Sequence, residues 1–458
     1  MTDHYDVIII GAGPAGIFAA REISRNSSSK VLLLEKGRTV EKRSCPVNEG
    51  AARCVNCQPC SIMSGWGGAG AFSDGKLTLT TEFGGWLSDY IGKEQLAKLI
   101  DYVDKIYLEH GAPNKIYGQN EEEFEEMRQH MARADLKLLP ACIRHMGTDN
   151  TLKVLQNLKT DLDQRITIKT EEAVEDILVE KRRVKGVKTK QATYYAPRVI
   201  CAPGRDGAQW FSEQARKLKI PLSNNQVDIG VRVELPSVTM QDFTDKVYEP
   251  KIIYNTKEFD DLVRTFCVNP NGHVVMENTN GIITVNGHSF ANTKSNNSNF
   301  ALLLSQEFTE PFNEPIVYGR CIASLANMLS GGIIVQRYGD LKRGRRSTKA
   351  RISKGMVEPS LKAAVPGDLS LVLPHRYMVG IKECLEALDK AIPGVGADHT
   401  LLYGIETKFY SARPQLSNNL KTCIEGLWAS GDGAGVTRGL IQASVSGIVA
   451  AREILSEM

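Results

Sequence analysis

Two short runs of consecutive apolar residues near the start of the chain predict buried parallel strands. The first run is Val7-Ile-Ile-Ile10 and the second is Val31-Leu-Leu-Leu34. Strands covered by helices on both faces lack the alternation of apolar and polar residues that half-exposed strands show. A helix is expected between the runs, so the segment has the strand, helix, strand order of a βαβ unit.

Helical and strand patterns alternate less regularly in the middle of the chain. Residues 93–107 and 121–133 have the periodicity of helices. Further on, residues 229–235, 282–285 and 333–335 are rich in β-branched residues and are separated by Gly/Asn turns. A late helix is expected over 378–392 and a helix of small residues over 439–451.

The turn after the first strand contains the glycine pattern of a dinucleotide-binding site. The first glycine permits a tight turn, the second lets the main chain approach a pyrophosphate, and the third lets the helix pack closely. The free N–H groups at the helix N-terminus then face the phosphates. Glu35 stands nineteen residues after Gly16, where it would accept hydrogen bonds from an adenosine ribose. The cofactor contacts predicted here are Gly11, Gly13, Pro14, Ala15, Gly16, Glu35 and Lys36.

The C-terminal end of the chain indicates which dinucleotide is bound. A short apolar strand leads into Asp432 among glycines, and the small-residue helix follows. This segment resembles the second flavin motif of the glutathione-reductase-like FAD superfamily. The resemblance implies that Asp432 holds the ribityl chain and that the helix N-terminus faces the pyrophosphate and the flavin. Residues 193–205 look like the segment that closes the FAD-binding unit. The implied contacts are Ala202, Gly204, Gly431, Asp432 and Gly439.

A glycine-rich loop at 64–77 indicates a particular family within this superfamily. It is similar to the GGAG-x-FSDGKL signature of a poorly characterised family of FAD-dependent dehydrogenases, and the similarity extends over nearly the whole chain. Gly68, Ala69 and Gly70 would lie beside the flavin. Other stretches that match this family are residues 228–234, 265–273, 284–289, 339–346 and 403–411.

These observations predict an α/β protein. A discontinuous Rossmann-like domain for FAD is expected from residues 1–80, 150–215 and 400–458, because its three motifs are separated by long insertions. Residues 85–150 are expected to form a helical insertion. Residues 216–400 are expected to form a mixed α+β domain on the substrate side.

Four of the ten cysteines lie close together in the chain. Cys45, Cys54, Cys57 and Cys60 follow the spacing C-x8-C-x2-C-x2-C. Tight C-x2-C-x2-C runs suit a [4Fe–4S] cluster, whose fourth ligand can come from further along the chain. Structural zinc, redox-active or disulfide-forming thiols, and free thiols on an ordered loop are the other interpretations. A cluster near the flavin would pass electrons singly to a redox protein partner.

The sequence is compatible with several electron donors to the flavin. No second glycine fingerprint for NAD(P)H occurs between residues 205 and 400. NAD(P)H can still visit the flavin transiently as a donor, or electrons can arrive through the cysteine site or from a protein.

Three side chains are candidates for catalysis on the substrate side. His288 is expected in a turn, where it could protonate or orient a substrate. Lys408 and Tyr410 lie in an alternating segment before the C-terminal motif, so that one of them can face the flavin. Each also has a plain structural interpretation, as a solvated turn residue or as a packing or ion-pair partner.

Composition argues against several other classes of protein. The formal net charge of +3 calls for no nucleic-acid partner, although the basic run 342–351 could hold a phosphate or a carboxylate. No apolar run approaches the ~18 residues of a membrane span. The first apolar run lacks a basic segment before it, so it is a strand and not a signal peptide, and a cytoplasmic location is expected.

The function predicted from these features is FAD-dependent oxidation or reduction. The enzyme would move a hydride or an electron pair between flavin and a small organic molecule, with a relay through an iron–sulfur centre as an addition. The alternative is a flavin-based electron carrier or redox sensor that acts with a protein partner.

Overall fold

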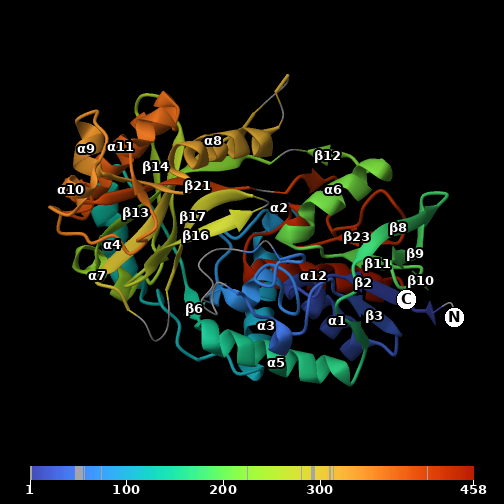
Figure 1. Ribbon diagram of the computed structural model, residues 1–458. Helices are drawn as coiled ribbons and strands as arrows, with labels where there is room; N and C mark the ends of the chain where they lie inside the picture. The colour runs from blue at the N-terminus through green and yellow to red at the C-terminus, as the bar shows by residue number, and fades with distance from the viewer. Residues whose placement is uncertain are drawn as a thin grey trace. The chain divides into compact units, whose positions relative to one another are not determined.

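The computed structural model describes residues 3–46, 55, 57–73, 75–223, 225–279, 281–289, 294–308, 311–312, 314–409 and 411–458. The chain divides into two compact units. Unit 1 contains Met1–Lys115, Arg144–Asn225 and Ser411–Met458, and unit 2 contains Ile116–Ile143 and Gln226–Tyr410. Figure 1 shows the helices and strands of both units.

A parallel sheet forms the centre of unit 1. Its strand order is β23-β11-β2-β3-β7. The strands are β2 (Val7–Ile10), β3 (Val31–Leu34), β7 (Thr167–Lys169), β11 (Val199–Cys201) and β23 (Leu427–Ala429). Every residue of β2 and β3 is buried, as the apolar runs predicted. The predicted α/β class is confirmed, and strands from both ends of the chain lie in one sheet.

Helices α1 (Pro14–Asn26) and α12 (Leu440–Ser456) pack against each other beside this sheet (Figure 1). Their small residues let the main chains come close, since a Cβ at Gly447 would lie 2.0 Å from the carbonyl oxygen of Ala15. The other α-helices of unit 1 are α2 (Leu87–Ile91), α3 (Lys93–Glu109), α5 (Thr148–Asp163) and α6 (Ala208–Lys217).

The predicted helical insertion at 85–150 is not a body of its own in this structure. Helices α2 and α3 belong to unit 1, whereas α4 (Glu121–Ala132) belongs to unit 2. The reason is that each helix buries its apolar stripe in a different core. Leu96, Leu99 and Val103 of α3 are buried in the core of unit 1, next to α12. His130 of α4 instead contacts the carbonyl oxygen of Ala391 in unit 2, at 2.8 Å.

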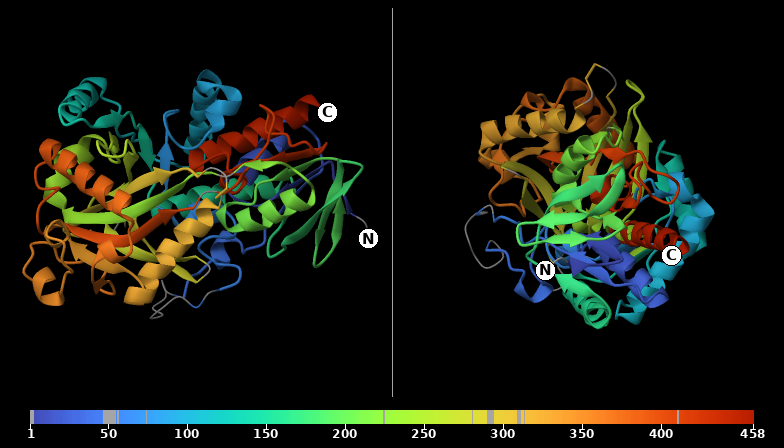
Figure 2. Two further views of the ribbon diagram at one scale, coloured as in Figure 1. Left: turned by 90° about the horizontal axis from the view of Figure 1, so that it is seen from above. Right: turned by 90° about the vertical axis from the view of Figure 1, so that its right-hand side faces the viewer.

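A second sheet of unit 1 lies near the N-terminus (Figure 2). Its strand order is β1-β10-β9-β8, with β1 (Asp3–His4), β8 (Val174–Glu180), β9 (Arg183–Thr189) and β10 (Thr193–Tyr195). The short strands β12 (Leu222–Ser223) and β22 (Arg413–Pro414) pair with each other. The remaining short strands are β4 (Lys76–Thr78) and β6 (Ile143–His145), which pair at the point where the chain returns to unit 1.

Unit 2 is built on one large, mostly antiparallel sheet. Its strand order is β20-β19-β21-β13-β18-β15-β14-β5. The strands are β5 (Lys137–Leu139), β13 (Val227–Pro236), β14 (Lys251–Asn255), β15 (Leu262–Asn269), β18 (Asn297–Gln306), β19 (Ile334–Arg337), β20 (Val365–Pro366) and β21 (Leu401–Lys408). The predicted mixed α+β composition of this part of the chain is therefore confirmed.

The two faces of this sheet differ in polarity although both are buried. Successive side chains of a strand point to opposite faces. In β13 the apolar Ile229, Val231 and Val233 alternate with Arg232 and Glu234, and all five side chains are 0 % exposed. The sheet therefore has one apolar face and one face that gathers charged groups.

Different elements cover the two faces. Helix α11 (His375–Ala391) packs on the apolar face, where a Cβ at Gly380 would lie 2.9 Å from Leu304 of β18. The hairpin of β16 (His273–Thr279) and β17 (Ile282–His288) contacts the polar face through Asn286. The other helices of unit 2 are α7 (Ser237–Lys246), α8 (Pro315–Ser330), α9 (Tyr338–Lys342) and α10 (Lys349–Ile352).

Within the described ranges, no helix combines the length and the apolar character needed to cross a membrane.

Shortening an apolar side chain of α3 should destabilise unit 1. Leu96 is 0 % exposed, so Leu96→Ala should lower the free energy of unfolding by about 2–5 kcal/mol. Lys98→Ala on the exposed side of α3 should change it by less than about 0.5 kcal/mol. Urea unfolding followed by tryptophan fluorescence compares the two variants. Equal stabilities would show that α3 does not belong to this core.

Candidate functional site

The turn between β2 and α1 has no room for side chains at two of its glycines. A Cβ at Gly11, where φ is +96°, would lie 2.2 Å from the carbonyl oxygen of Ala202, and one at Gly16 would lie 1.9 Å from that of Gly11. Gly13 differs, because a Cβ there would meet no atom within 4 Å. The first and third glycines therefore serve close packing, and the second leaves space above the main chain.

The other predicted motifs converge on this turn within unit 1. The loop at 67–70 reaches it through a hydrogen bond from Gly67 N to Ala12 O of 2.7 Å. Ala202 N donates to Ile10 O at 2.8 Å, and Ser430 N donates to Cys201 O at 3.0 Å. The structure therefore brings together segments that are more than 400 residues apart in the chain.

Two helix N-termini lie among these segments. Helix α1 begins after Gly13 and α12 begins after Gly439; neither has a side-chain cap or an acidic residue in its first turn. The first N–H groups of a helix lack partners within the helix and carry partial positive charge. Gly70 lies close to both helix ends, since a Cβ there would lie 2.4 Å from Leu440 of α12 and 3.9 Å from Pro14 of α1. Such an arrangement can bind phosphate groups.

Glu35 joins the turn to the neighbouring loops. Its buried carboxylate accepts hydrogen bonds from the main-chain nitrogens of Ala12 at 2.8 Å, Gly37 at 2.8 Å and Gly65 at 2.9 Å. A carboxylate has about four acceptor positions, so about one is left for a further donor. Lys36, by contrast, pairs with Asp206 at 2.6 Å.

Asp432 lies just before the N-terminus of α12. Its carboxylate accepts from Thr437 Oγ1 at 2.8 Å and from Gly439 N at 3.4 Å. Burial raises the pKa of Asp432, and the charges of Arg205 and Arg438 oppose that rise in part. Two arginines therefore act electrostatically on this carboxylate.

Arg43 organises the loop that precedes the glycine-rich segment, and no sequence motif pointed to it. Its guanidinium donates to the carbonyl oxygens of Ser61, Ile62, Trp66 and Gly68, at 2.7–2.9 Å. Burial lowers the pKa of Arg43 to about 10, against the opposing charges of Glu35 and Cys60. In the described part of the chain, no carboxylate lies within ion-pair distance of it. Arg43 therefore fixes the loop mainly through hydrogen bonds to carbonyl groups.

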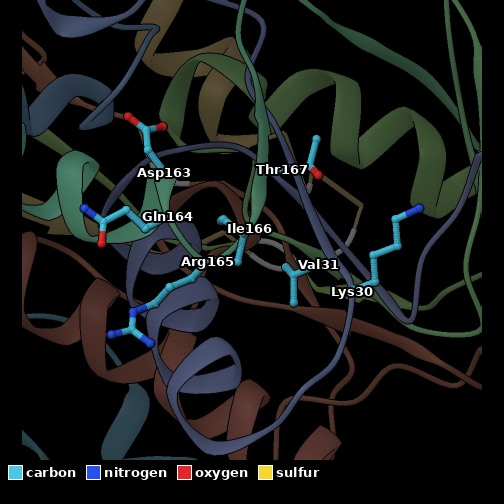
Figure 3. A pocket seen from close by; sticks show the side chains of 7 residues that line it. All are labelled: Lys30, Val31, Asp163, Gln164, Arg165, Ile166 and Thr167. Carbon is cyan, nitrogen blue, oxygen red and sulfur yellow. The ribbon is translucent and has the colours of Figure 1, made fainter.

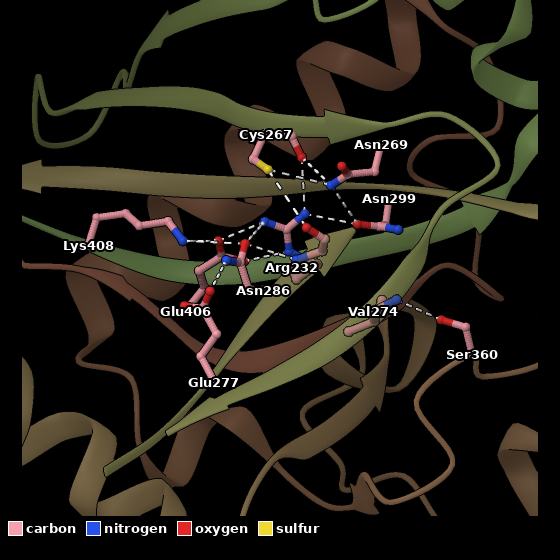
Figure 4. Close-up of polar contacts among 11 residues, drawn as sticks. Arg232, Cys267, Asn269, Val274, Glu277, Asn286, Asn299, Ser360, Glu406 and Lys408 are labelled. Carbon is pink, nitrogen blue, oxygen red and sulfur yellow. Dashed lines mark hydrogen bonds and ion pairs between the residues drawn. The ribbon is translucent and has the colours of Figure 1, made fainter. Parts of the chain in front are cut away.

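Unit 2 contains a buried charged network on the polar face of its sheet (Figure 4). Arg232 and Glu406, both 0 % exposed, form a two-pronged ion pair with distances of 2.7 Å. The guanidinium also donates to Cys267 O, to Asn299 Oδ1 and to Asn286 Oδ1. Burial alone would lower the pKa of Arg232, but Glu406 outweighs it and the pKa is raised.

Lys408 is attached to this network. Its ammonium lies 3.0 Å from Glu406 Oε1 and 3.5 Å from Asn286 Oδ1 (Figure 4). Burial opposes its charge, but Glu406 and Glu277 outweigh that effect and raise the pKa of Lys408. Lys408 therefore remains an ammonium at neutral pH.

The other two catalytic candidates are His288 and Tyr410. The expectation of a turn at His288 is wrong: it is the last residue of β17 and pairs with His273 of β16. The hairpin continues to His288 because β16 supplies a partner for every residue of β17. Tyr410 lies outside the described residues.

The cysteine loop is described only in part. Cys45, Cys57 and Cys60 are free thiols, and Cys54 lies outside the described residues. Among the residues with described positions, no three His, Cys, Asp or Glu side chains are grouped so that they could hold a metal ion. The iron–sulfur centre therefore stays a prediction.

Three of the six basic side chains in the run 342–351 pair with carboxylates of unit 2. Lys342 and Arg343 pair with Asp398, and Arg345 pairs with Asp340. For these three residues the contacts favour a structural role.

A hollow of about 190 Å³ lies at the other end of the parallel sheet (Figure 3). Its lining comes from the start of β3, the start of β7 and the end of α5: Lys30, Val31, Asp163, Gln164, Arg165, Ile166 and Thr167. Cofactors of parallel sheets bind at the carboxyl ends of the strands, whereas this hollow is at the amino ends. None of the predicted contacts lines it.

Residues 226–409 match the family model described as "FAD-dependent protein, C-terminal domain-like". The matched range lies within unit 2 and includes Arg232, Glu406 and Lys408. The match supports FAD as the cofactor of this protein.

Other similarities extend over nearly the whole chain. An uncharacterised protein of Clostridium beijerinckii is 27 % identical over 476 residues, which cover 98 % of this chain and 80 % of that protein. A 3-ketosteroid-Δ4-(5α)-dehydrogenase of Rhodococcus jostii RHA1 is 14 % identical, with a TM-score of 0.45 and coverage of 99 % and 97 %. A formate oxidase of Aspergillus oryzae is 12 % identical, with a TM-score of 0.45 and coverage of 99 % and 98 %.

Replacing Arg43 should loosen the loop beside the glycine-rich segment. Arg43→Met leaves buried carbonyl groups without a donor, so the free energy of unfolding should fall by about 2–4 kcal/mol. The matched control is Arg38→Met, because Arg38 is 56 % exposed and pairs with the exposed Glu171. Urea unfolding monitored by the fluorescence of buried Trp66 gives both values. Wild-type stability in Arg43→Met would contradict the role assigned to this guanidinium.

Proposed function

We propose that this protein is a FAD-dependent oxidoreductase whose cofactor lies in unit 1. The main observation in support is that Gly13, Gly204 and Gly439, from three distant segments, each have open space where a Cβ would stand. Neighbouring glycines of the same segments are tightly packed, as Gly11 and Gly433 are. The open positions therefore form a cradle of exposed main chain, which is what a pyrophosphate and its attached groups require.

The chain's own groups fit FAD. The N-termini of α1 and α12 would bind the pyrophosphate through main-chain N–H groups. Glu35 would orient the adenosine ribose with its remaining acceptor position, and Asp432 would accept hydrogen bonds from the ribityl hydroxyls. Bound FAD supplies the capacity to take up a hydride or two electrons.

We further propose that unit 2 provides the groups that meet a small organic substrate. Lys408 is the first candidate, because its ammonium pairs with Glu406, which the buried Arg232 holds in place. His288 and Tyr410 remain candidates for proton transfer. NAD(P)H remains a candidate donor that binds transiently.

Substitution of Gly13 separates cofactor binding from folding. Gly13 has φ −78° and ψ −179°, which any residue adopts, and a Cβ there meets nothing within 4 Å. Gly13→Val should therefore fold like the wild type while its side chain blocks the approach of the pyrophosphate. FAD affinity, measured by quenching of flavin fluorescence, should fall by at least ~100-fold. Unchanged affinity in a folded Gly13→Val protein would refute the proposed cradle.

Anaerobic reduction distinguishes the enzyme from the alternative, an electron carrier or redox sensor with a protein partner. The enzyme should be bleached by NAD(P)H or by a small organic reductant alone, with absorbance at the flavin band as the readout. Reduction only by a redox protein would support the carrier. Iron and sulfide assays on the same anaerobic sample test the predicted cluster.

A further inference from the structure

Arg438 stands directly before the N-cap of α12, and its position is set by a second segment of unit 1. Arg438 N donates to Gly84 O at 2.7 Å, and Trp86 N donates to Val436 O at 3.0 Å. Because of these two hydrogen bonds, the segment 84–86 lies alongside the segment 436–438. Two tightly constrained main chains therefore meet beside the N-terminus of α12.

Gly85 makes this approach possible. A Cβ there would lie 2.6 Å from Thr437 Cα, and its φ of +130° lies in the range that favours glycine. The double glycine before Trp86 thus brings the indole ring up to residues 436–438. No flavin motif of the sequence contains this segment.

Trp86 holds the Arg438 side chain by stacking. The guanidinium carbon of Arg438 lies 4.0 Å from the centroid of the Trp86 ring, and that of Arg413 lies 5.0 Å from it. A guanidinium on an indole face is attracted by the π electrons, and the ring limits its motion. The Trp86 ring therefore limits the positions that the charged group of Arg438 can take.

The surroundings of Arg438 concentrate positive charge. The first turn of α12 contains no acidic residue. Arg438 and Arg205 both favour the ionised form of Asp432 electrostatically. The N–H of Gly439 at the helix end and the guanidinium charge of Arg438 thus both favour the ionised form of Asp432.

We propose that Arg438 is the residue whose charge stabilises reduced FAD in this protein. This inference rests on the proposed function. Transfer of a hydride from substrate to flavin N5 delivers two electrons and one proton, and it leaves one negative charge in the pyrimidine part of the ring. The guanidinium that Trp86 holds would lower the free energy of that anion relative to neutral oxidised FAD. Arg438 therefore raises the reduction potential of the bound flavin.

Sulfite is the probe for this charge. Its electron pair forms a bond to flavin N5, which places a negative charge in the same part of the ring as reduction does. In holoprotein with Arg438→Gln, sulfite affinity should fall by about tenfold or more, and the midpoint potential should become more negative. Arg438→Lys should retain most of both properties because it keeps the charge.

Arg413→Gln is the matched control, because it removes the other guanidinium on Trp86 and leaves the segment 436–438 intact. It should keep the wild-type potential and sulfite affinity. Trp86→Leu, which removes the ring but no charge, should give an intermediate loss. Because Arg438→Lys and Trp86→Leu also report on the charge, the test does not depend on Arg438→Gln folding.

The outcomes separate this inference from the proposed function. Wild-type protein that fails to bind FAD would refute the proposed function. An Arg438→Gln variant that binds FAD with unchanged potential and sulfite affinity would overturn the inference alone. Equal losses in Arg438→Gln and Arg413→Gln would also overturn it, since they would indicate a structural effect of the stack.

Discussion

The rest of unit 1 depends on the approach of the β2–α1 turn to the chain that leaves β11. Gly11 lies so close to Ala202 that no side chain fits between them, and Gly16 lies equally close to Gly11. Because β11 pairs with both β2 and β23, this contact also sets where Gly431 and Asp432 follow β23. A larger residue at Gly11 would displace β11, and the segments that form the proposed cradle would separate together.

The stability of unit 2 depends on how its buried ion pair is compensated. Taking Arg232 and Glu406 out of water costs several kcal/mol per ion. A two-pronged contact and three further acceptors offset that cost, so that every N–H of the guanidinium has a partner. The consequence is an ammonium, on Lys408, that is anchored from one side by a rigid network.

Two arginines of unit 1 make contacts that none of the glycine motifs in the sequence indicated. Arg43 binds four carbonyl groups of the loop before Gly68, and Arg438 stacks on Trp86 beside α12. The predicted strands and the glycine positions were readable from the chain, because turn geometry and burial act over a few residues. The arginine contacts were not, since they depend on which distant carbonyl or ring the fold brings near.

The sequence by itself determined the α/β class and the two buried strands near the N-terminus, and it predicted which glycines and acidic residues bind a dinucleotide. These follow from local physics: apolar runs bury, and tight turns exclude a Cβ. The tertiary structure alone decided that α3 and α4 belong to different units, that Lys36 pairs with Asp206, and that Glu35 binds three amide groups. Such outcomes depend on distances between segments far apart in the chain, which only packing sets.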